Sequence, residues 1–181
     1  FPSNSVIEGA ATVGIRPIMA RMERTVINMA DGYTRTTNGR PVGVVAVQHG
    51  PGIENAYGGV AQAYSDSSPM LVLSAQEETA RLGMPSQYDG VRNYQGITKW
   101  AGQINLAERI PALMGRAFTY LYTGRPGPVM LEVPTDVGGA DIDESNFRYD
   151  CVRRIRSAGD PENIDEVAEV LGSAKSPIIY A

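Results

Sequence analysis

Cysteine and histidine are scarce in this chain, and their scarcity excludes several kinds of site. The 181 residues include one cysteine and one histidine. The single thiol, Cys151, cannot form a disulfide within the chain, and this favours a reducing, cytoplasmic location. The lone histidine, His49, cannot build a metal site with other histidines. The sequence therefore excludes a metal site built from several histidines.

Long apolar runs and basic blocks are also missing. No apolar run approaches the ~18 residues that a membrane-spanning helix needs. The formal net charge is −4, and no long basic block offers a nucleic-acid surface. Hydrophobic residues make up 43% and charged residues 20%, which is ordinary for a globular domain. We therefore expect neither a nucleic acid nor a membrane as a partner.

Short apolar strands alternate with helical segments along most of the chain. The patterns predict strands at 17–22, 42–47, 70–75 and 128–133, and helices at 6–13, 24–36, 55–64 and 107–122. The strand at 42–47 is apolar on both faces, as in a parallel strand that helices cover on each side. This order predicts an α/β fold, a doubly wound parallel sheet with helices on both faces.

The chain divides into three parts by composition. Residues 1–137 read as one α/β domain, and residues 138–160 as a polar linker without periodicity. In residues 161–181, a helical pattern over 162–171 precedes a strand that begins at Ile178. We interpret this last part as the truncated beginning of a second α/β domain.

Polar residues follow three of the predicted strands. Glu23 follows the first strand, the segment from Gln48 to Gly52 follows the second, and Ser74, Gln76 and Glu77 follow or end the third. Ligands of open α/β sheets bind beyond the carboxyl ends of the strands. We therefore expect these three groups to line one rim of the sheet.

Glu23 has two interpretations on spacing alone. A carboxylate at the start of a helix is stabilised by the helix dipole by roughly 0.3–1 kcal/mol, which needs no function. Alternatively, Met22, Val26 and Ile27 make its surroundings partly apolar, which favours a carboxyl that exchanges protons near neutrality.

The segment from His49 to Gly52 is equally open. Gly50-Pro51-Gly52 is a tight turn by composition, and its glycines allow the backbone to approach a ligand closely. It is neither a Walker loop nor a dinucleotide fingerprint, because no GK[ST] or GxGxxG accompanies it. His49 either bonds to local backbone or contacts substrate or cofactor.

Six short motifs in order resemble one enzyme family. They are RME at 21–23, MADGYTR at 29–35, GPGIEN at 50–55, AQAYSDSSP at 61–69, GRPGPV at 124–129 and VPTDV at 133–137. Together they resemble the N-terminal, pyrimidine-binding domain of the acetolactate synthase-like thiamine-diphosphate enzymes. The resemblance covers residues 1–137 and implies that the first strand of that domain lies before Phe1.

The resemblance implies roles for particular residues. Glu23 matches the glutamate that hydrogen-bonds a pyrimidine nitrogen of thiamine diphosphate and so activates the thiazolium carbon. Gly50, Pro51, Gly52 and Asn55 match the segment that walls the pyrimidine. Gln87 falls near the family's active-site glutamine and is otherwise an exposed loop amide, while His49 replaces a frequent serine. The candidate catalytic residues are thus Glu23, Gln87 and His49.

The resemblance also implies what the rest of the protein supplies. Magnesium and the diphosphate would be held by a C-terminal domain beyond these residues, and FAD is a further candidate cofactor because some relatives bind it. The two cofactor-binding domains of one site come from different subunits in this family, so we expect a homodimer or homotetramer. We also expect the 181 residues to be inactive alone.

Three functions are consistent with these motifs. The first is decarboxylation and carboligation of 2-keto acids, as in acetolactate synthase. The second is a 2-keto acid decarboxylase or C–C lyase of the same family. The third is a non-catalytic binding module that retains the fold, which has no need of the Glu23 carboxyl.

Overall fold

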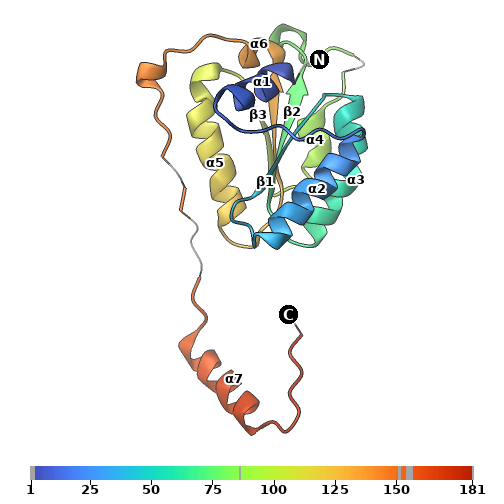
Figure 1. The fold of residues 1–181 in the computed structure, drawn as a ribbon. Coiled ribbons are helices and arrows are strands. Elements are labelled where there is room, and N and C mark those ends of the chain that lie inside the picture. The colour runs from blue at the N-terminus through green and yellow to red at the C-terminus, as the bar shows by residue number, and fades with distance from the viewer. Residues whose placement is uncertain (1–2, 86, 151, 154–156, 181) are drawn as a thin grey trace.

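Figure 1 shows a computed structural model of the chain, an α/β body from which a long C-terminal segment extends. The structure describes residues 3–85, 87–150, 152–153 and 157–180. Cys151 lies outside the described residues.

Four parallel strands form the centre of the body. They are β1 (Gly43–Val47), β2 (Met70–Gln76), β3 (Trp100–Gln103) and β4 (Val129–Pro134), in the spatial order β1-β2-β4-β3. Each neighbouring pair is parallel. All four carboxyl ends therefore lie at the same edge of the sheet, which confirms the predicted fold class.

Helices cover both faces of the sheet (Figure 1). α2 (Glu23–Thr36), α3 (Pro51–Ser65) and α4 (Gly90–Tyr94) lie on one side, and α5 (Ile110–Tyr122) lies on the other. α1 (Asn4–Thr12) and α6 (Thr135–Gly138) contact each other near the carboxyl edge. Short 3-10 helices occupy Thr79–Arg81, Ala107–Arg109 and Glu144–Asn146. None of the helices in the described part of the chain is long and apolar enough to cross a membrane.

Alternate strand residues point into two separate cores, as the period of a strand requires. Met70 and Val72 of β2 pack with α2, α3 and α4, whereas Leu71 packs with α5. On β4, Met130 belongs to the first core and Leu131 to the second. Burial on both faces explains why these strands read as continuous apolar runs.

Two glycines let backbones approach closely in the first core. A Cβ on Gly43 would lie 2.4 Å from the carbonyl oxygen of Ala30, so β1 contacts α2 directly. The Gly43 N–H also donates to the buried Thr34 Oγ1 at 2.7 Å. A Cβ on Gly59 would lie 2.7 Å from Ile27, so the small residues of α3 serve its packing on α2.

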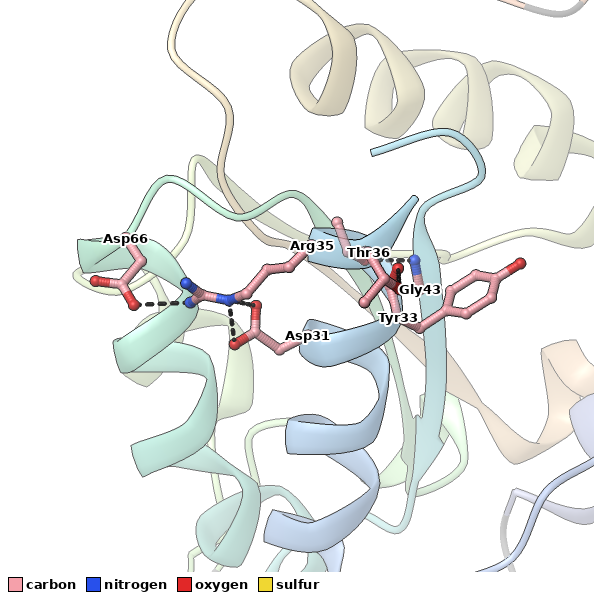
Figure 2. A network of polar contacts seen from close by, with 7 residues as sticks. Asp31, Tyr33, Arg35, Thr36, Gly43 and Asp66 are labelled. Carbon is pink, nitrogen blue, oxygen red and sulfur yellow. Dashed lines mark hydrogen bonds and ion pairs between the residues drawn. The ribbon is translucent and has the colours of Figure 1, made fainter. Parts of the chain in front are cut away.

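An ion-pair network joins the C-terminal ends of α2 and α3 (Figure 2). Arg35 Nε lies 3.0 Å from each carboxylate oxygen of Asp31, and Arg35 Nη2 lies 2.7 Å from Asp66 Oδ2. Asp66 follows α3, so Arg35 links the two helix ends. Part of the MADGYTR motif therefore has a structural task at the end of the sheet opposite to Glu23.

The structure contradicts two predicted strands. Residues 15–20 have no regular secondary structure, so the predicted strand at 17–22 is wrong. Ile18 and Met19 are 60% and 75% exposed, and β1, the neighbour available at the sheet edge, leaves Val44 54% exposed. The strand predicted from Ile178 is also wrong, since residues 177–180 are irregular and exposed. A strand needs a partner, and an apolar pattern does not supply one.

Two further elements differ from expectation. β3 was not predicted, because Trp100-Ala-Gly-Gln103 has little β-branched character and is half-buried. The helix expected at 55–64 begins at Pro51, so the Gly50-Pro51-Gly52 segment is the start of α3. A proline is well accommodated in the first turn of a helix, where its missing N–H has no partner to lose.

The helix predicted over 162–171 is present as α7 (Pro161–Ser173). It begins after Asp160, whose carboxylate accepts from the N–H groups of Glu162 and Asn163. No residue of α7 is buried, and Ile164, Val167, Val170 and Leu171 are exposed. The division into a domain at 1–137, a linker at 138–160 and a second domain from 161 stays a prediction.

Candidate functional site

Glu23 is the first residue of α2 and lies at the carboxyl edge of the sheet. Its side chain is partly exposed, and its Oε2 accepts from Asn55 Nδ2 at 3.4 Å. Asn55 belongs to α3, so the beginnings of two helices meet at this carboxylate. The carboxyl thus lies next to the partial positive charge of a helix N-terminus.

The Gly50-Pro51-Gly52 segment brings the backbone next to Glu23. Gly50 precedes α3 with φ 60° and ψ −117°, a conformation that a residue with a Cβ rarely adopts. A Cβ on Gly52 would lie 2.9 Å from Gln48 Cβ and 3.7 Å from Glu23 Oε1. The second glycine thus keeps a side chain away from the glutamate carboxyl.

His49 connects the carboxyl ends of β1 and β2. Its Nε2 lies 3.1 Å from Glu77 Oε1, and Arg81 Nη1 lies 3.4 Å from the other oxygen of Glu77. The local backbone contact considered for His49 is therefore replaced by a side-chain contact. His49 Nδ1 is buried and has no hydrogen-bond partner in the part of the chain that the structure describes.

Gln87 is a half-buried amide with both ends occupied. Its Nε2 donates to Gln76 Oε1 at 3.0 Å, and its Oε1 accepts from the Gly83 N–H at 2.7 Å. Because its side chain is partly buried and hydrogen-bonded at both ends, Gln87 is not the exposed loop amide of the alternative interpretation. The same Gln76 Oε1 accepts from the Glu77 N–H at 2.8 Å, which places the Gln87 group beside the His49 group.

Glu132 of β4 was missed as a site residue. It is 3% exposed, and its Oε1 accepts from Gln76 Nε2 at 3.1 Å. Its Oε2 accepts from Gln103 Nε2 at 3.0 Å. Burial raises the pKa of the Glu132 carboxyl, although these amide contacts act in the opposite direction. A charged residue inside the apolar run at 129–133 was the signal that could have identified it.

A cavity of about 500 Å³ opens beside Gln87 and Glu132. Its lining comes from β2, β3, β4 and the segment at 82–91: Gln76, Leu82, Gly83, Met84, Gln87, Tyr88, Asp89, Val91, Gln103 and Glu132. The location beyond the carboxyl ends of the strands is where open α/β sheets bind ligands.

A second cavity of about 370 Å³ lies at the opposite end of the sheet, around Lys99. The Lys99 ammonium donates to the carbonyl oxygen of Thr123 at 2.6 Å and to that of Tyr120. Burial lowers the pKa of Lys99. Because these contacts satisfy carbonyls at the end of α5, a structural role explains this lysine.

The expected rim residues therefore form two groups. Glu23, Gly52 and Asn55 make the first, and the second extends from His49 through Glu77 to Gln76 and Gln87. Ser74 belongs to neither group, because it is buried and its hydroxyl donates to the Ala75 carbonyl. Over the described ranges, no cluster of three or more His, Cys, Asp or Glu side chains could hold a metal ion.

Comparison with known proteins identifies the family. The profile described as "Thiamine pyrophosphate enzyme, N-terminal TPP binding domain" matches residues 2–101. The chain belongs to this thiamine pyrophosphate enzyme family. Thiamine pyrophosphate and thiamine diphosphate are names of one compound. The predicted family and its fold are thus confirmed.

Acetolactate synthases are among the relatives of this chain. The large subunit from Buchnera aphidicola (subsp. Schizaphis graminum) is 35% identical over 192 residues, 100% of this chain and 33% of that protein. The large subunit from Lactococcus lactis is 35% identical, over 93% of this chain and 30% of that protein. The isozyme 3 large subunit from Escherichia coli is 33% identical, over 99% and 33%. The chain spans about a third of the length of these curated relatives.

The residues at the start of α2 and α3 fit thiamine pyrophosphate. The Glu23 carboxyl has a single long contact from Asn55 at Oε2, and its Oε1 has no hydrogen-bond partner among the residues the structure describes. Glycine at position 52 leaves open the approach that a side chain would fill. A carboxyl with a free oxygen beside an uncovered backbone suits a flat heteroaromatic ring with polar nitrogens.

Proposed function

We propose that this chain is the pyrimidine-binding domain of an acetolactate synthase-like enzyme that decarboxylates and joins 2-keto acids. The observation that carries the proposal is the Glu23 carboxyl, with a free oxygen facing the glycine segment at 50–52. The similarity to acetolactate synthases supports the substrate class. Glu23 also disfavours a non-catalytic module, which has no use for this carboxyl.

Thiamine diphosphate, when bound, supplies a carbon nucleophile and accepts the electrons released by decarboxylation. The chain's own residues hold the pyrimidine and move a proton. Glu23 exchanges a proton at its free Oε1 with a ring nitrogen, and Asn55 orients that carboxyl through Oε2. The backbone at Gly52 lies against the ring because no side chain intervenes.

We assign two further residues to the substrate side. Gln87 lines the cavity of about 500 Å³, where its amide can contact a keto or carboxylate oxygen. His49 lies beside the glycine segment and pairs with Glu77. An ionisable group there favours a second candidate, a decarboxylase or lyase in which His49 delivers a proton and an aldehyde leaves.

We propose that magnesium, the diphosphate and any FAD are held by residues outside this chain. The protein then works as a homodimer or homotetramer whose sites lie between subunits, and residues 1–181 alone are inactive. Size measurement of the full-length protein tests the assembly. An active full-length monomer, or cofactor-dependent turnover by the 181 residues, contradicts these statements.

The test of the proposed function is pyruvate consumption by the full-length protein with and without thiamine diphosphate and magnesium. We expect consumption that requires the cofactor, and a condensed hydroxyketo acid as the product. An aldehyde would favour the decarboxylase instead. Absence of consumption despite measured cofactor binding would exclude pyruvate as the substrate.

Glu23→Gln supplies the residue-level test. Because the amide cannot exchange the proton, we expect turnover to fall about 10²–10⁴-fold while the folded structure is kept. Glu108→Gln, which neutralises an exposed glutamate of a 3-10 helix, is the matched control and should retain activity. Equal activity of the two variants would contradict the role of Glu23.

A further inference from the structure

Glu132 begins a directed chain of hydrogen bonds that ends at Gln87. Gln76 Nε2 donates to Glu132 Oε1 at 3.1 Å, and Gln87 Nε2 donates to Gln76 Oε1 at 3.0 Å. Gln87 Oε1 in turn accepts from the Gly83 N–H at 2.7 Å. The chain links β4 to β2 and then to the segment that carries Gln87.

The carboxylate favours one direction of this chain, and the Tyr88 carbonyl and the Glu77 N–H favour the same one. An ionised carboxylate only accepts hydrogen bonds, so the NH₂ end of Gln76 must face Glu132. The carbonyl end of Gln76 then faces outward and accepts from both Gln87 Nε2 and the Glu77 N–H. Gln87 is consequently held with its carbonyl toward Gly83.

The surroundings of Glu132 hold the carboxylate in place. Gln103 Nε2 occupies Oε2, and a Cβ on Gly90 would lie 2.4 Å from Oε1, so the start of α4 closes over the group. The Gly90 N–H further stabilises the charged form. The hydrogen bonds of this buried carboxylate run to Gln76, Gln103 and Gly90, and none of these residues belongs to the group of Glu23, Gly52 and Asn55.

We propose that Glu132 is a positioning residue that orients the Gln87 amide through Gln76. This inference rests on the proposed function, because it makes Gln87 the amide that meets the 2-keto acid. Without the acceptor at position 132, only the Glu77 N–H and a long 3.5 Å contact to the Tyr88 carbonyl still hold the direction of the Gln76 amide, so Gln76 can turn its amide over. Its NH₂ end would then face the NH₂ end of Gln87, and Gln87 would lose its fixed orientation.

Two substitutions separate orientation from charge. Glu132→Met keeps an unbranched side chain of similar length but removes the acceptor. Glu132→Gln removes the charge but keeps a carbonyl oxygen that can face Gly90 and Gln76, while Gln103 turns over to match its NH₂ end. In the full-length protein we expect Glu132→Met to lower kcat about 10-fold to 100-fold. Glu132→Gln should stay within about threefold of the wild type.

A double-mutant cycle tests whether the effect passes through Gln87. In a Gln87→Ala background, Glu132→Met should cause no further loss of kcat, because the oriented amide is already gone. Glu108→Met is the control for a glutamate-to-methionine change at an exposed position. Losses that multiply, or equal losses in both Glu132 variants, would overturn the proposal.

Hydrogen exchange at the Gly83 amide gives a readout that needs no activity. Glu132→Met should accelerate exchange of this N–H relative to the wild type and Glu132→Gln, because Gln87 Oε1 no longer holds it. Unchanged protection would overturn the positioning role. If the wild type consumes no 2-keto acid, the proposed function fails, and the Gly83 result still decides the orientation of Gln87.

Discussion

The two ends of the sheet both place charged side chains next to helix termini, but with opposite signs. At the amino end of the strands, Arg35 lies at the end of α2, Arg125 donates to the Ser65 carbonyl at the end of α3, and Lys99 donates to carbonyls at the end of α5. Cations are stabilised at helix C-termini by the unsatisfied carbonyls and the helix dipole. Each of these groups has partners within the chain.

At the carboxyl end, acidic groups stand near helix N-termini. Glu23 begins α2, and Glu54 lies in the first turn of α3. Asp136 lies in the first turn of α6 and accepts from the Thr79 N–H. Here Glu23 Oε1 and the cavity of about 500 Å³ remain available to a ligand, and the side-chain amides of Gln76 and Gln87 connect β4, β2 and the segment that carries Gln87. The same rule of helix electrostatics thus accounts for paired cations at one end of the sheet and for a candidate binding site at the other.

The largest expected effect concerns the contact between β1 and α2. Gly43→Ala would place a Cβ 2.4 Å from the Ala30 carbonyl oxygen, so β1 and α2 must separate. We expect the free energy of unfolding to fall by about 1–3 kcal/mol, as for other overpacked cores. Urea denaturation measures it. Gly115→Ala is the control, because open space surrounds this glycine of α5 and the change should stabilise by up to about 1 kcal/mol. Equal effects of the two changes would show that the contact at Gly43 carries no strain.

The second prediction concerns Glu132, near the carboxyl edge of the sheet, and the pH dependence of its contribution to stability. Burial raises the pKa of Glu132 in the folded protein above its ordinary 4.5. The folded state then binds this proton more tightly than the unfolded state, so the contribution of Glu132 to stability is greatest below pH 4.5 and is lost as pH rises through the raised pKa. Each pKa unit between the folded and the unfolded state corresponds to about 1.4 kcal/mol in the free energy of unfolding.

Glu132→Gln isolates this contribution. As pH rises from about 4.5, the free energy of unfolding of the wild type should fall relative to that of Glu132→Gln, because the amide does not titrate. The difference between the two proteins should become constant above the pKa of Glu132 in the folded state. Denaturation midpoints at a series of pH values measure it, with Glu108→Gln as the reference for an exposed glutamate. A difference that does not vary with pH would mean that burial does not penalise the Glu132 carboxylate.

Much of the secondary structure could be predicted from the local sequence pattern. The apolar runs of β2 and β4 and the helical spacing of α2 and α5 are properties of contiguous residues, so they were visible in the sequence. β3 and residues 17–22 show the limit. Strand formation depends on a partner far along the chain, and β3 has one in β4 whereas 17–22 has none.

The candidate site divides in the same way. The rule that ligands bind at strand ends pointed to Glu23 and Gly52, which do lie together. The network around Glu132 was not foreseen, because Gln76 and Glu132 are 56 positions apart and meet only through the pairing of β2 with β4. The direction of that network depends on which amide end faces the carboxylate, and residue spacing carries no such information.

The smallest expected effect is at the ion pair between Arg35 and Asp66. Both side chains are more than 40% exposed, at 44% and 43%, so water and salt screen their attraction. Asp66→Asn should therefore lower the free energy of unfolding by at most about 1 kcal/mol. Urea denaturation at low ionic strength and in about 1 M NaCl measures the loss, which should shrink in salt. Asp31→Asn is the matched change, because Asp31 is only 13% exposed and meets Arg35 with both oxygens. A larger and salt-independent loss in Asp66→Asn than in Asp31→Asn would mean that the link between α2 and α3, rather than exposure, sets the strength of this network.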